Sequence, residues 1–327
     1  MADIMTSLTP LIERINSVML ELISRDEEVV ARISGYGFEG GGKRLRPVMF
    51  CLITEALGRP LNQLALETSC SFEFLHLATL LHDDIVDLAE VRRGRMAAHL
   101  AFGVPGTVLA GDYLLAKAAG LGAMTGNIDC VKVMSEAARI LSLGELVQLG
   151  ARRRADLPEE EYFQIIYRKT AVLMEGACRT AAILAGADEG TLQAAVDYGR
   201  KFGLAFQIVD DVLDYRGDEA TFGKPVGHDL EEGKITLPFI LAREALAAEP
   251  LTGKAERLME LAGAETVDDQ ARAEIIALVQ EGGGIKAALR RAGDLANEAA
   301  AALSALAPSA ALEKLQALAA FTVDRQW

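Results

Sequence analysis

Two groups of aspartates with the same spacing stand out in this 327-residue chain. Both groups read DDxxD, and their members are Asp83, Asp84, Asp87, Asp210, Asp211 and Asp214. Residues four apart in an α-helix lie about 40° apart around its axis, so the first and last carboxylates of each group face the same way. Each group closes an apolar run, HLATLLHDDIVD or GLAFQIVDDVLD, which predicts that both lie late in largely buried helices.

Carboxylates at this spacing in buried helices need a cation. Several ionised carboxylates buried without a partner cost several kcal/mol, or their pKa values rise until they are neutral. Mg²⁺ takes oxygen ligands and usually binds one or two carboxylates together with substrate phosphates. A single DDxxD fits a solvated acidic turn about as well, but two copies in apolar helices disfavour that interpretation. The spacing therefore predicts two facing clusters that hold a diphosphate through Mg²⁺.

Basic segments accompany the acidic ones. The segment GGGKRLRP combines glycines, whose backbone N–H groups can approach an anion closely, with Lys43, Arg44 and Arg46. Further cations follow each aspartate group or lie in apolar helix, and these are Arg92, Arg93, Arg95, Lys169, Lys224 and Lys234. They predict a second diphosphate site that uses lysine and arginine directly. The run Arg152–Arg154 has no acidic group nearby in sequence and reads as a solvated loop.

The apolar periodicity is helical almost throughout. Helices are predicted over residues 7–33, 62–91, 105–124, 128–151, 158–186, 190–217, 234–248, 251–263, 267–280, 284–304 and 309–323. Breaks are predicted at the glycine and proline clusters 35–42, 58–60, 103–106 and 217–233. No Pro/Ser-rich linker divides the chain, so we expect one all-α domain over residues 1–327.

Composition limits the possible functions. The chain is 51% hydrophobic and 24% charged, which suits a globular fold with one large core. A net charge of −14 argues against nucleic-acid partners and against adhesion to anionic membranes. No apolar run is long enough to cross a bilayer, and no signal peptide is recognisable. Four widely spaced cysteines read as buried apolar residues in a reducing compartment, so we expect a cytoplasmic protein.

The ordered series GGGKRLRP, LLHDDIVD, RRG, GDYLL, GELVQL, YRKTA, FQIVDDVLD and GKPVGHDLEEGKITLP resembles the motifs of the trans-isoprenyl diphosphate synthases, or polyprenyl synthetases. The resemblance runs from about Gly40 to Pro238. It implies an all-α bundle of long, mostly antiparallel helices around a deep central cavity, usually as a homodimer. It also implies about three Mg²⁺ ions and two substrates, isopentenyl diphosphate and an allylic diphosphate.

The resemblance assigns roles to individual residues. Asp83, Asp87 and Asp210 would bind Mg²⁺, supported by Asp84, Asp211 and Asp214. The allylic diphosphate would be held by Arg92, Lys169, Thr170, Gln207, Lys224 and Lys234. Catalysis would depend chiefly on Asp83, Asp87, Asp210, Lys169 and Lys224. Isopentenyl diphosphate would be held by Lys43, Arg46, His76 and Arg93. His76 also lies about 20° from Asp83 around the helix, whereas His82 faces away and is expected in the core.

Product length is expected to depend on the helix that carries Asp83. Short-chain relatives have bulky aromatics four and five residues before the first aspartate, where this chain has Thr79 and Ala78. Leu75 and Phe74 lie one turn deeper. Small side chains at the first two positions predict a long all-trans product of roughly eight to ten isoprene units, one unit per helical turn. A quinone side chain is the usual use of such a product in bacteria. The alternatives are a farnesyl or geranylgeranyl diphosphate synthase, a terpene cyclase and a non-catalytic partner subunit.

Overall fold

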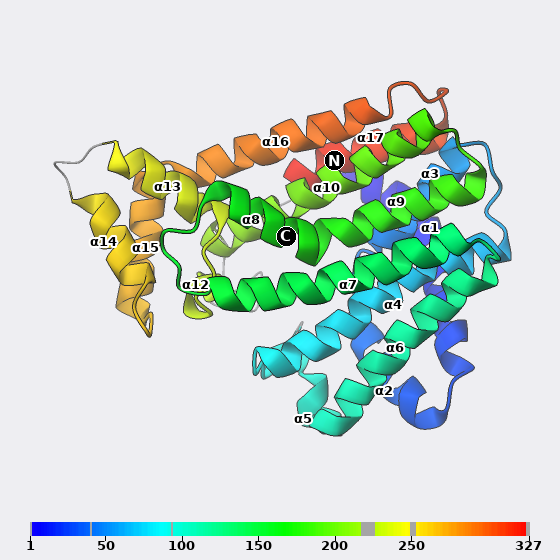
Figure 1. Cartoon of the computed structure of the whole chain (residues 1–327), viewed down its shortest axis with the longest axis horizontal. Coiled ribbons are helices and arrows are strands. Elements are labelled where there is room, and N and C mark those ends of the chain that lie inside the picture. The colour runs from blue at the N-terminus through cyan, green and yellow to red at the C-terminus, as the bar shows by residue number, and fades with distance from the viewer. Residues whose placement is uncertain (1, 40, 93, 217–225, 249–252, 325–327) are drawn as a thin grey trace. The chain divides into compact units, whose positions relative to one another are not determined.

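The computed structural model describes residues 2–39, 41–92, 94–216, 226–248 and 253–324. Helices make up nearly all of the regular structure in these ranges, as predicted (Figure 1). The chain divides into two compact units. The first comprises Met1–Arg139, Leu173–Gly199 and Ala300–Leu318, and the second comprises Ile140–Val172, Arg200–Ala299 and Ala319–Trp327. Among the described residues, no helix is long and apolar enough to cross a membrane.

The first unit is built around helix α4 (Gln63–Val86). Its other N-terminal elements are α1 (Ala2–Ser24), α2 (Glu28–Glu39), α3 (Leu45–Ala56), the hairpin β1 (Val91–Arg92) and β2 (Arg95–Met96), α5 (Ala98–Phe102) and α6 (Val104–Met124). Helix α4 packs along α6 and also contacts α1 and α3 (Figure 1). It begins where the Asn62 side chain accepts a hydrogen bond from the Ala65 N–H, at 2.8 Å. Residues 66–75 are all buried, so a buried central helix carries the first aspartate group at its C-terminal end.

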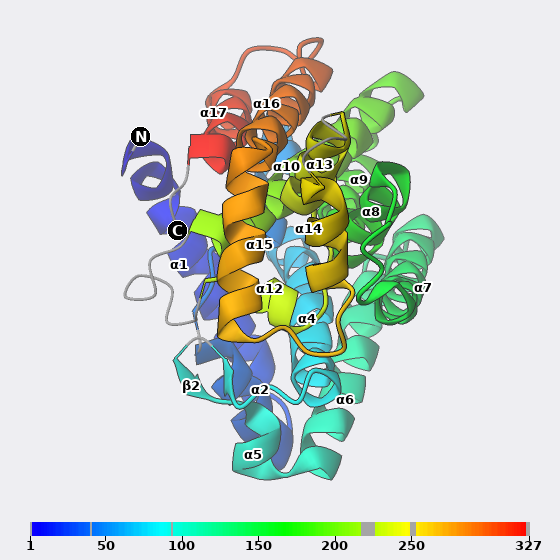
Figure 2. The ribbon, with the colours of Figure 1, turned by 90° about the vertical axis from the view of Figure 1, so that its left-hand side faces the viewer.

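The second unit begins within α7 (Ile128–Ala151) and continues through α8 (Glu159–Ile166) and the π-helical turn η1 (Tyr167–Ala171). After α9 (Val172–Ala185), the chain returns to it within α10 (Glu189–Arg216). The remaining elements of this unit are α12 (His228–Glu231), α13 (Leu237–Ala247), α14 (Lys254–Ala262), α15 (Asp269–Glu281) and most of α16 (Gly284–Ala302), whereas most of α17 (Ala310–Asp324) belongs to the first unit. Helices α13, α14 and α15 pack against one another (Figure 2). The core between α8, α10 and α13 centres on Tyr162, Ile208, Tyr215 and Phe239.

Three predictions at the N-terminal end were wrong in detail. The helix predicted over 7–33 is two helices, because the chain turns at 25–27. The break predicted at 35–42 begins only after Glu39, since Gly35 and Gly37 lie inside α2. A Cβ at Gly37 would come 2.8 Å from Leu77 Cδ1, so this glycine permits close packing on α4 and does not end the helix. Helix α3 was not predicted, because its buried residues 45–54 show no amphipathic period.

Three further differences follow from tertiary contacts. The helix predicted over 62–91 ends at Val86, before the hairpin. The helix predicted over 158–186 is interrupted by η1. The run Arg152–Arg154 is not a solvated loop, because Arg153 donates to the carbonyls of Ala264 at 2.8 Å and Glu231 at 3.3 Å. The four cysteines are buried and unpaired, as predicted.

Candidate active site

The first aspartate group lies at the C-terminal end of α4. Asp83 is in the last helical turn, and Asp87 follows as the C-cap, with its N–H bonded to the Asp83 carbonyl at 2.8 Å. Both aspartates are half-buried, whereas the Asp84 side chain is only 3% exposed. The helix thus separates the group into two accessible carboxylates one turn apart and one carboxylate directed into the protein. The roles of Asp83 and Asp87 as ligands and of Asp84 as a supporting residue stay predictions.

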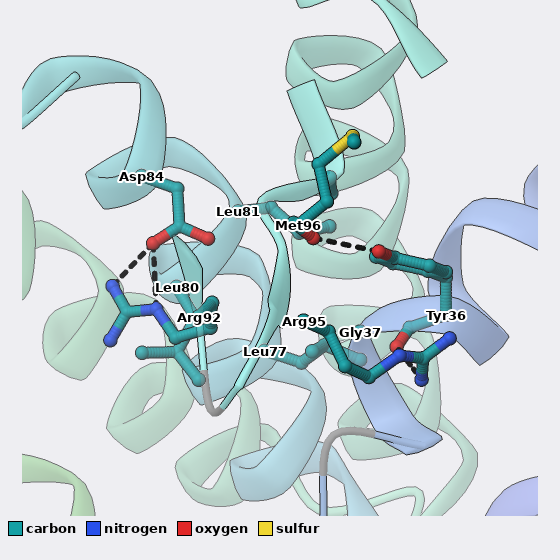
Figure 3. A pocket seen from close by; sticks show the side chains of 10 residues that line it. Tyr36, Gly37, Leu77, Leu80, Leu81, Asp84, Arg92, Arg95 and Met96 are labelled. Carbon is teal, nitrogen blue, oxygen red and sulfur yellow. Dashed lines mark hydrogen bonds and ion pairs between the residues drawn. The ribbon is translucent and has the colours of Figure 1, made fainter. Parts of the chain in front are cut away.

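Asp84 is paired with Arg92 of strand β1. Arg92 Nε donates to Asp84 Oδ1 at 2.7 Å, and an Arg92 Nη forms an ion pair with the same oxygen (Figure 3). The arginine lies in a pocket lined by Leu77, Leu80 and Leu81 of α4. Arg92 therefore neutralises a buried carboxylate of the acidic group in this structure. Its predicted contact with the allylic diphosphate stays a prediction.

The hairpin that carries Arg92 is fixed to α2 (Figure 3). The Tyr36 hydroxyl donates to the carbonyl of Met96 at 2.7 Å, and the Arg95 guanidinium lies 4.1 Å from the centre of the Tyr36 ring. Arg95 also pairs with Glu39, at 3.3 Å. These contacts place the basic hairpin beside the helix that leads into the glycine-rich segment. Arg93 lies outside the described residues.

The glycine-rich segment leads into α3. Lys43 is half-buried in the loop, and Arg46 is buried in the first turn of α3. Arg44 adopts the left-handed conformation, with φ 51°, and its side chain turns inward to Glu73 of α4. His76, one turn beyond Glu73, lines a cavity together with Arg44 and Glu73. Glu73 was missed by the sequence analysis, although its place three residues before His76 puts it on the same helix face.

The second aspartate group lies in α10, and its middle member, Asp211, is buried as Asp84 is in the first group. Asp211 accepts hydrogen bonds from the Tyr162 hydroxyl at 2.6 Å and from Gln207 Nε2 at 2.8 Å. Thr170 donates in turn to Gln207 Oε1 at 2.6 Å. Burial, with Asp229 nearby, raises the pKa of Asp211 above its usual range. Gln207 and Thr170, two of the residues predicted to hold the allylic diphosphate, are thus joined by hydrogen bonds to Asp211.

Asp214 lies one turn further along α10. Its carboxylate accepts the backbone N–H groups of His228 at 3.1 Å and Asp229 at 3.2 Å. Burial and the nearby Asp229 nevertheless raise its pKa from 3.8 to about 7. Asp229 was missed by the sequence analysis, because only the fold brings the 226–234 turn beneath α10.

The same turn presents Lys234. Its ammonium forms ion pairs with Glu232 and with Asp229, the latter at 3.7 Å. Gly233, the residue before Lys234, is fixed by Arg153, whose backbone N–H donates to the Gly233 carbonyl at 2.7 Å. Lys224, which was predicted to hold the allylic diphosphate, lies outside the described residues.

The π-helical turn η1 carries Lys169 and Thr170. Lys169 forms an ion pair with Glu145 of α7, at 2.7 Å, and donates a hydrogen bond to Gln148. A Cβ at Gly203 of α10 would come 2.5 Å from the backbone of Ala171, so α10 approaches this turn as closely as a glycine allows. An extra residue in a helical turn shifts the faces of its neighbours, and such turns are frequent at functional sites.

The predicted chain-length residues lie within α4. Ala78, Leu75 and Phe74 are buried, and Thr79 is half-buried, with its hydroxyl donating to the His76 carbonyl at 2.8 Å. Their role stays a prediction. His82 was expected in the core but is only half-buried, because it lies against α6 with its Nε2 3.0 Å from the Val108 carbonyl.

The acidic groups suit a metal that completes its coordination with substrate. Within the described ranges, no cluster of three or more His, Cys, Asp or Glu side chains could by itself enclose a metal ion. Mg²⁺ does not require such a cage, since it usually binds one or two carboxylates and takes its other ligands from phosphates and water. The donors are all oxygens, and burial together with Asp229 raises the pKa values of Asp211 and Asp214, so a bound cation would stabilise their charged forms. These observations fit Mg²⁺ brought together with a diphosphate.

An all-helical fold with two DDxxD groups and lysines and arginines around them defines a class of metal-assisted enzymes that act on prenyl diphosphates. The polyprenyl synthetase family model matches residues 27–279, and the chain belongs to this family of prenyltransferases, which is of the Mg²⁺-dependent type.

The chain is 36% identical over 318 residues to the octaprenyl diphosphate synthase of Haemophilus influenzae, which covers 97% of this chain and 95% of that protein. It is also 36% identical over 303 residues to a short chain isoprenyl diphosphate synthase of Methanothermobacter thermautotrophicus, covering 91% of each. A crystal structure of a decaprenyl diphosphate synthase from Rhodobacter capsulatus superposes with a TM-score of 0.88 and 34% identity, covering 99% of this chain and 98% of that one.

Proposed function

We propose that this enzyme condenses isopentenyl diphosphate head-to-tail with an allylic diphosphate to build a long all-trans polyprenyl diphosphate, octaprenyl to decaprenyl. The observation that carries the proposal is that the chain has two DDxxD groups, each late in a long helix, and an ordered series of basic motifs. The octaprenyl and decaprenyl synthases similar to the chain support the long product. The chain is equally identical to a short-chain synthase, so overall sequence similarity does not set the length of the product. The small side chains of Thr79 and Ala78 are the feature that favours a long product.

The chain's own residues are proposed to bind and orient the two substrates. Asp83, Asp87 and Asp210 ligate the metal, and Lys169 and Lys234 contact the allylic diphosphate. Mg²⁺ held by these aspartates would neutralise the diphosphate and stabilise the charge that develops on it as it leaves. The carbon–oxygen bond breaks to give an allylic cation and pyrophosphate.

The second substrate reacts with this cation. Lys43, Arg46 and His76 hold isopentenyl diphosphate by its own diphosphate, so that its alkene lies next to the cation. The alkene electrons form the new carbon–carbon bond, and one proton is lost to the departing pyrophosphate. The cations around the diphosphates favour this charge separation without a side-chain nucleophile.

Four finer features belong to the same proposal. We propose about three Mg²⁺ ions, as the family resemblance implies. We propose a homodimer, supported by exposed apolar side chains on α6 such as Leu109 and Met124. We propose a single functional domain over residues 1–327. We propose a cytoplasmic location, supported by four buried, unpaired cysteines.

Product analysis tests the proposal directly. The purified protein is incubated with labelled isopentenyl diphosphate, farnesyl diphosphate and Mg²⁺, and the products are identified by mass spectrometry. We expect polyprenyl diphosphates of roughly eight to ten isoprene units and none when EDTA replaces Mg²⁺. A product that ends at farnesyl or geranylgeranyl length contradicts the long-chain assignment. A cyclised hydrocarbon indicates a terpene cyclase, and turnover only with an added second protein indicates a partner subunit.

A further inference from the structure

Three charged side chains form a buried cluster in the first unit. Arg44, Arg46 and Glu73 are 7%, 8% and 4% exposed. Both guanidinium groups lie near the same carboxylate, that of Glu73. Buried charges are tolerated only when they are paired, so their arrangement is constrained by the fold.

The Arg44 side chain makes several contacts within the protein. Its guanidinium donates to Asn16 Oδ1 at 3.0 Å, to the Phe38 carbonyl at 3.0 Å and to Glu73 Oε1 at 3.2 Å. It also lies 4.0 Å from the centre of the Phe38 ring. These contacts bind α1, the end of α2 and α4 to the glycine-rich segment. They also fix one oxygen of Glu73.

The other oxygen of Glu73 is directed at Arg46. Glu73 Oε2 lies 3.7 Å from Arg46 Nη1, is buried, and accepts no hydrogen bond from the described residues. A buried carboxylate oxygen in this position attracts the guanidinium electrostatically without fixing it by a short hydrogen bond. A guanidinium carries five N–H donors, so an arginine held on one side by a carboxylate can present another side to a phosphate.

We infer that Glu73 is a positioning residue that orients Arg46 toward the diphosphate of isopentenyl diphosphate; this inference rests on the proposed function. His76, another residue proposed to bind this substrate, lines the cavity that Arg44 and Glu73 share. Arg44 holds the carboxylate in place, and the carboxylate in turn attracts the guanidinium of Arg46, the residue proposed to bind the substrate.

The variant Glu73→Gln tests this role because it keeps the shape of the side chain and removes its charge. We expect the KM for isopentenyl diphosphate to rise about tenfold or more, as befits loss of one partner of a buried charge pair. The KM for the allylic substrate and kcat should change less than about threefold. Calorimetric titration with isopentenyl diphosphate, without metal or allylic substrate, should show the same weakening of binding.

Glu67 offers a matched control on the same helix. It is buried to a similar degree, accepts from Gln63 at 2.9 Å and lies 3.5 Å from an Arg25 Nη. Glu67→Gln should leave both KM values and the calorimetric affinity unchanged. Should Glu73→Gln fail to fold, Glu73→Asp, which keeps the charge but draws the carboxylate back by one methylene, carries the same comparison.

Equal changes in the two KM values, or an unchanged affinity for isopentenyl diphosphate, overturn the positioning role. A wild-type protein that does not turn over isopentenyl diphosphate with an allylic partner contradicts the proposed function instead. The two failures are distinct, because calorimetry measures binding of the substrate without turnover. A double variant Glu73→Gln with Arg46→Gln should bind no more weakly than Arg46→Gln alone, since Glu73 acts through Arg46.

Discussion

Replacing Asp214 by asparagine should change how the stability of the metal-free enzyme depends on pH. The carboxyl is half-buried in α10, and its pKa is raised from 3.8 to about 7 by burial and by Asp229, against the opposing effects of two backbone N–H donors and Lys234. In the unfolded chain this carboxyl has released its proton above about pH 4. Folding at neutral pH must therefore either bury a charge or take up a proton, and each costs free energy.

The sign and size of the effect follow from that shift. Because the folded state binds more protons than the unfolded chain, stability falls as the pH rises from about 4 to about 7 and then levels off. The raised pKa of Asp214 corresponds to a loss of stability of roughly 4 kcal/mol above pH 7 and of less than half as much at pH 5. Asparagine keeps one oxygen for the N–H groups of His228 and Asp229 and carries no charge. The variant should therefore gain about 3 kcal/mol more over the wild type at pH 8 than at pH 5.

Thermal unfolding of both proteins in EDTA, at several pH values between 4 and 8, measures this difference. The wild-type curve should fall with pH more steeply than that of the variant, and the two should separate most above pH 7. Titration of the Asp214 carboxyl by NMR, assigned by its absence from the variant, gives the pKa directly. Parallel stability curves, or an Asp214 pKa near 4, would refute the reasoning.

The other predictions concern catalysis. Asp83→Ala or Asp210→Ala should lower kcat by about a thousandfold or more while leaving the circular dichroism spectrum unchanged, and near-normal turnover in both would contradict the metal role. Lys43→Ala should raise KM chiefly for isopentenyl diphosphate and Lys234→Ala chiefly for the allylic substrate, so equal effects on both constants would mean that the two sites are wrongly assigned. Ala78→Phe should shorten the product to about three or four isoprene units by mass spectrometry, because the phenyl ring adds bulk one turn before the aspartates; an unchanged product would show that chain length is set elsewhere.

The positions of the chemical groups could be predicted well from the sequence. The repeated DDxxD spacing places two carboxylates of each group on one helix face, because the helical period is a local property of the backbone. The glycines and cations around each group are also adjacent along the chain. The helical period likewise predicted the long helices α6, α7 and α10 within one or two residues of their ends.

The features that the sequence did not predict are those that depend on tertiary packing. Helix α3 is buried all around, so it has no polar face to reveal a period. Gly37 resembles a helix breaker in sequence, but it lies inside α2 because Leu77 fills the space beside it. Arg153 resembles a solvated cation until the carbonyls of Ala264 and Glu231 are brought to it by folding.

The sequence by itself determined the all-helical class, the family and the two acidic groups, because each depends on residues close together in the chain. Only the tertiary structure decided which of those residues are paired. Asp84 is bound to Arg92, Arg44 to Glu73 and Asp211 to Tyr162, over separations of 8, 29 and 49 residues. Pairing of this kind depends on how helices pack, and the strength of each pair depends on burial, which no local pattern encodes.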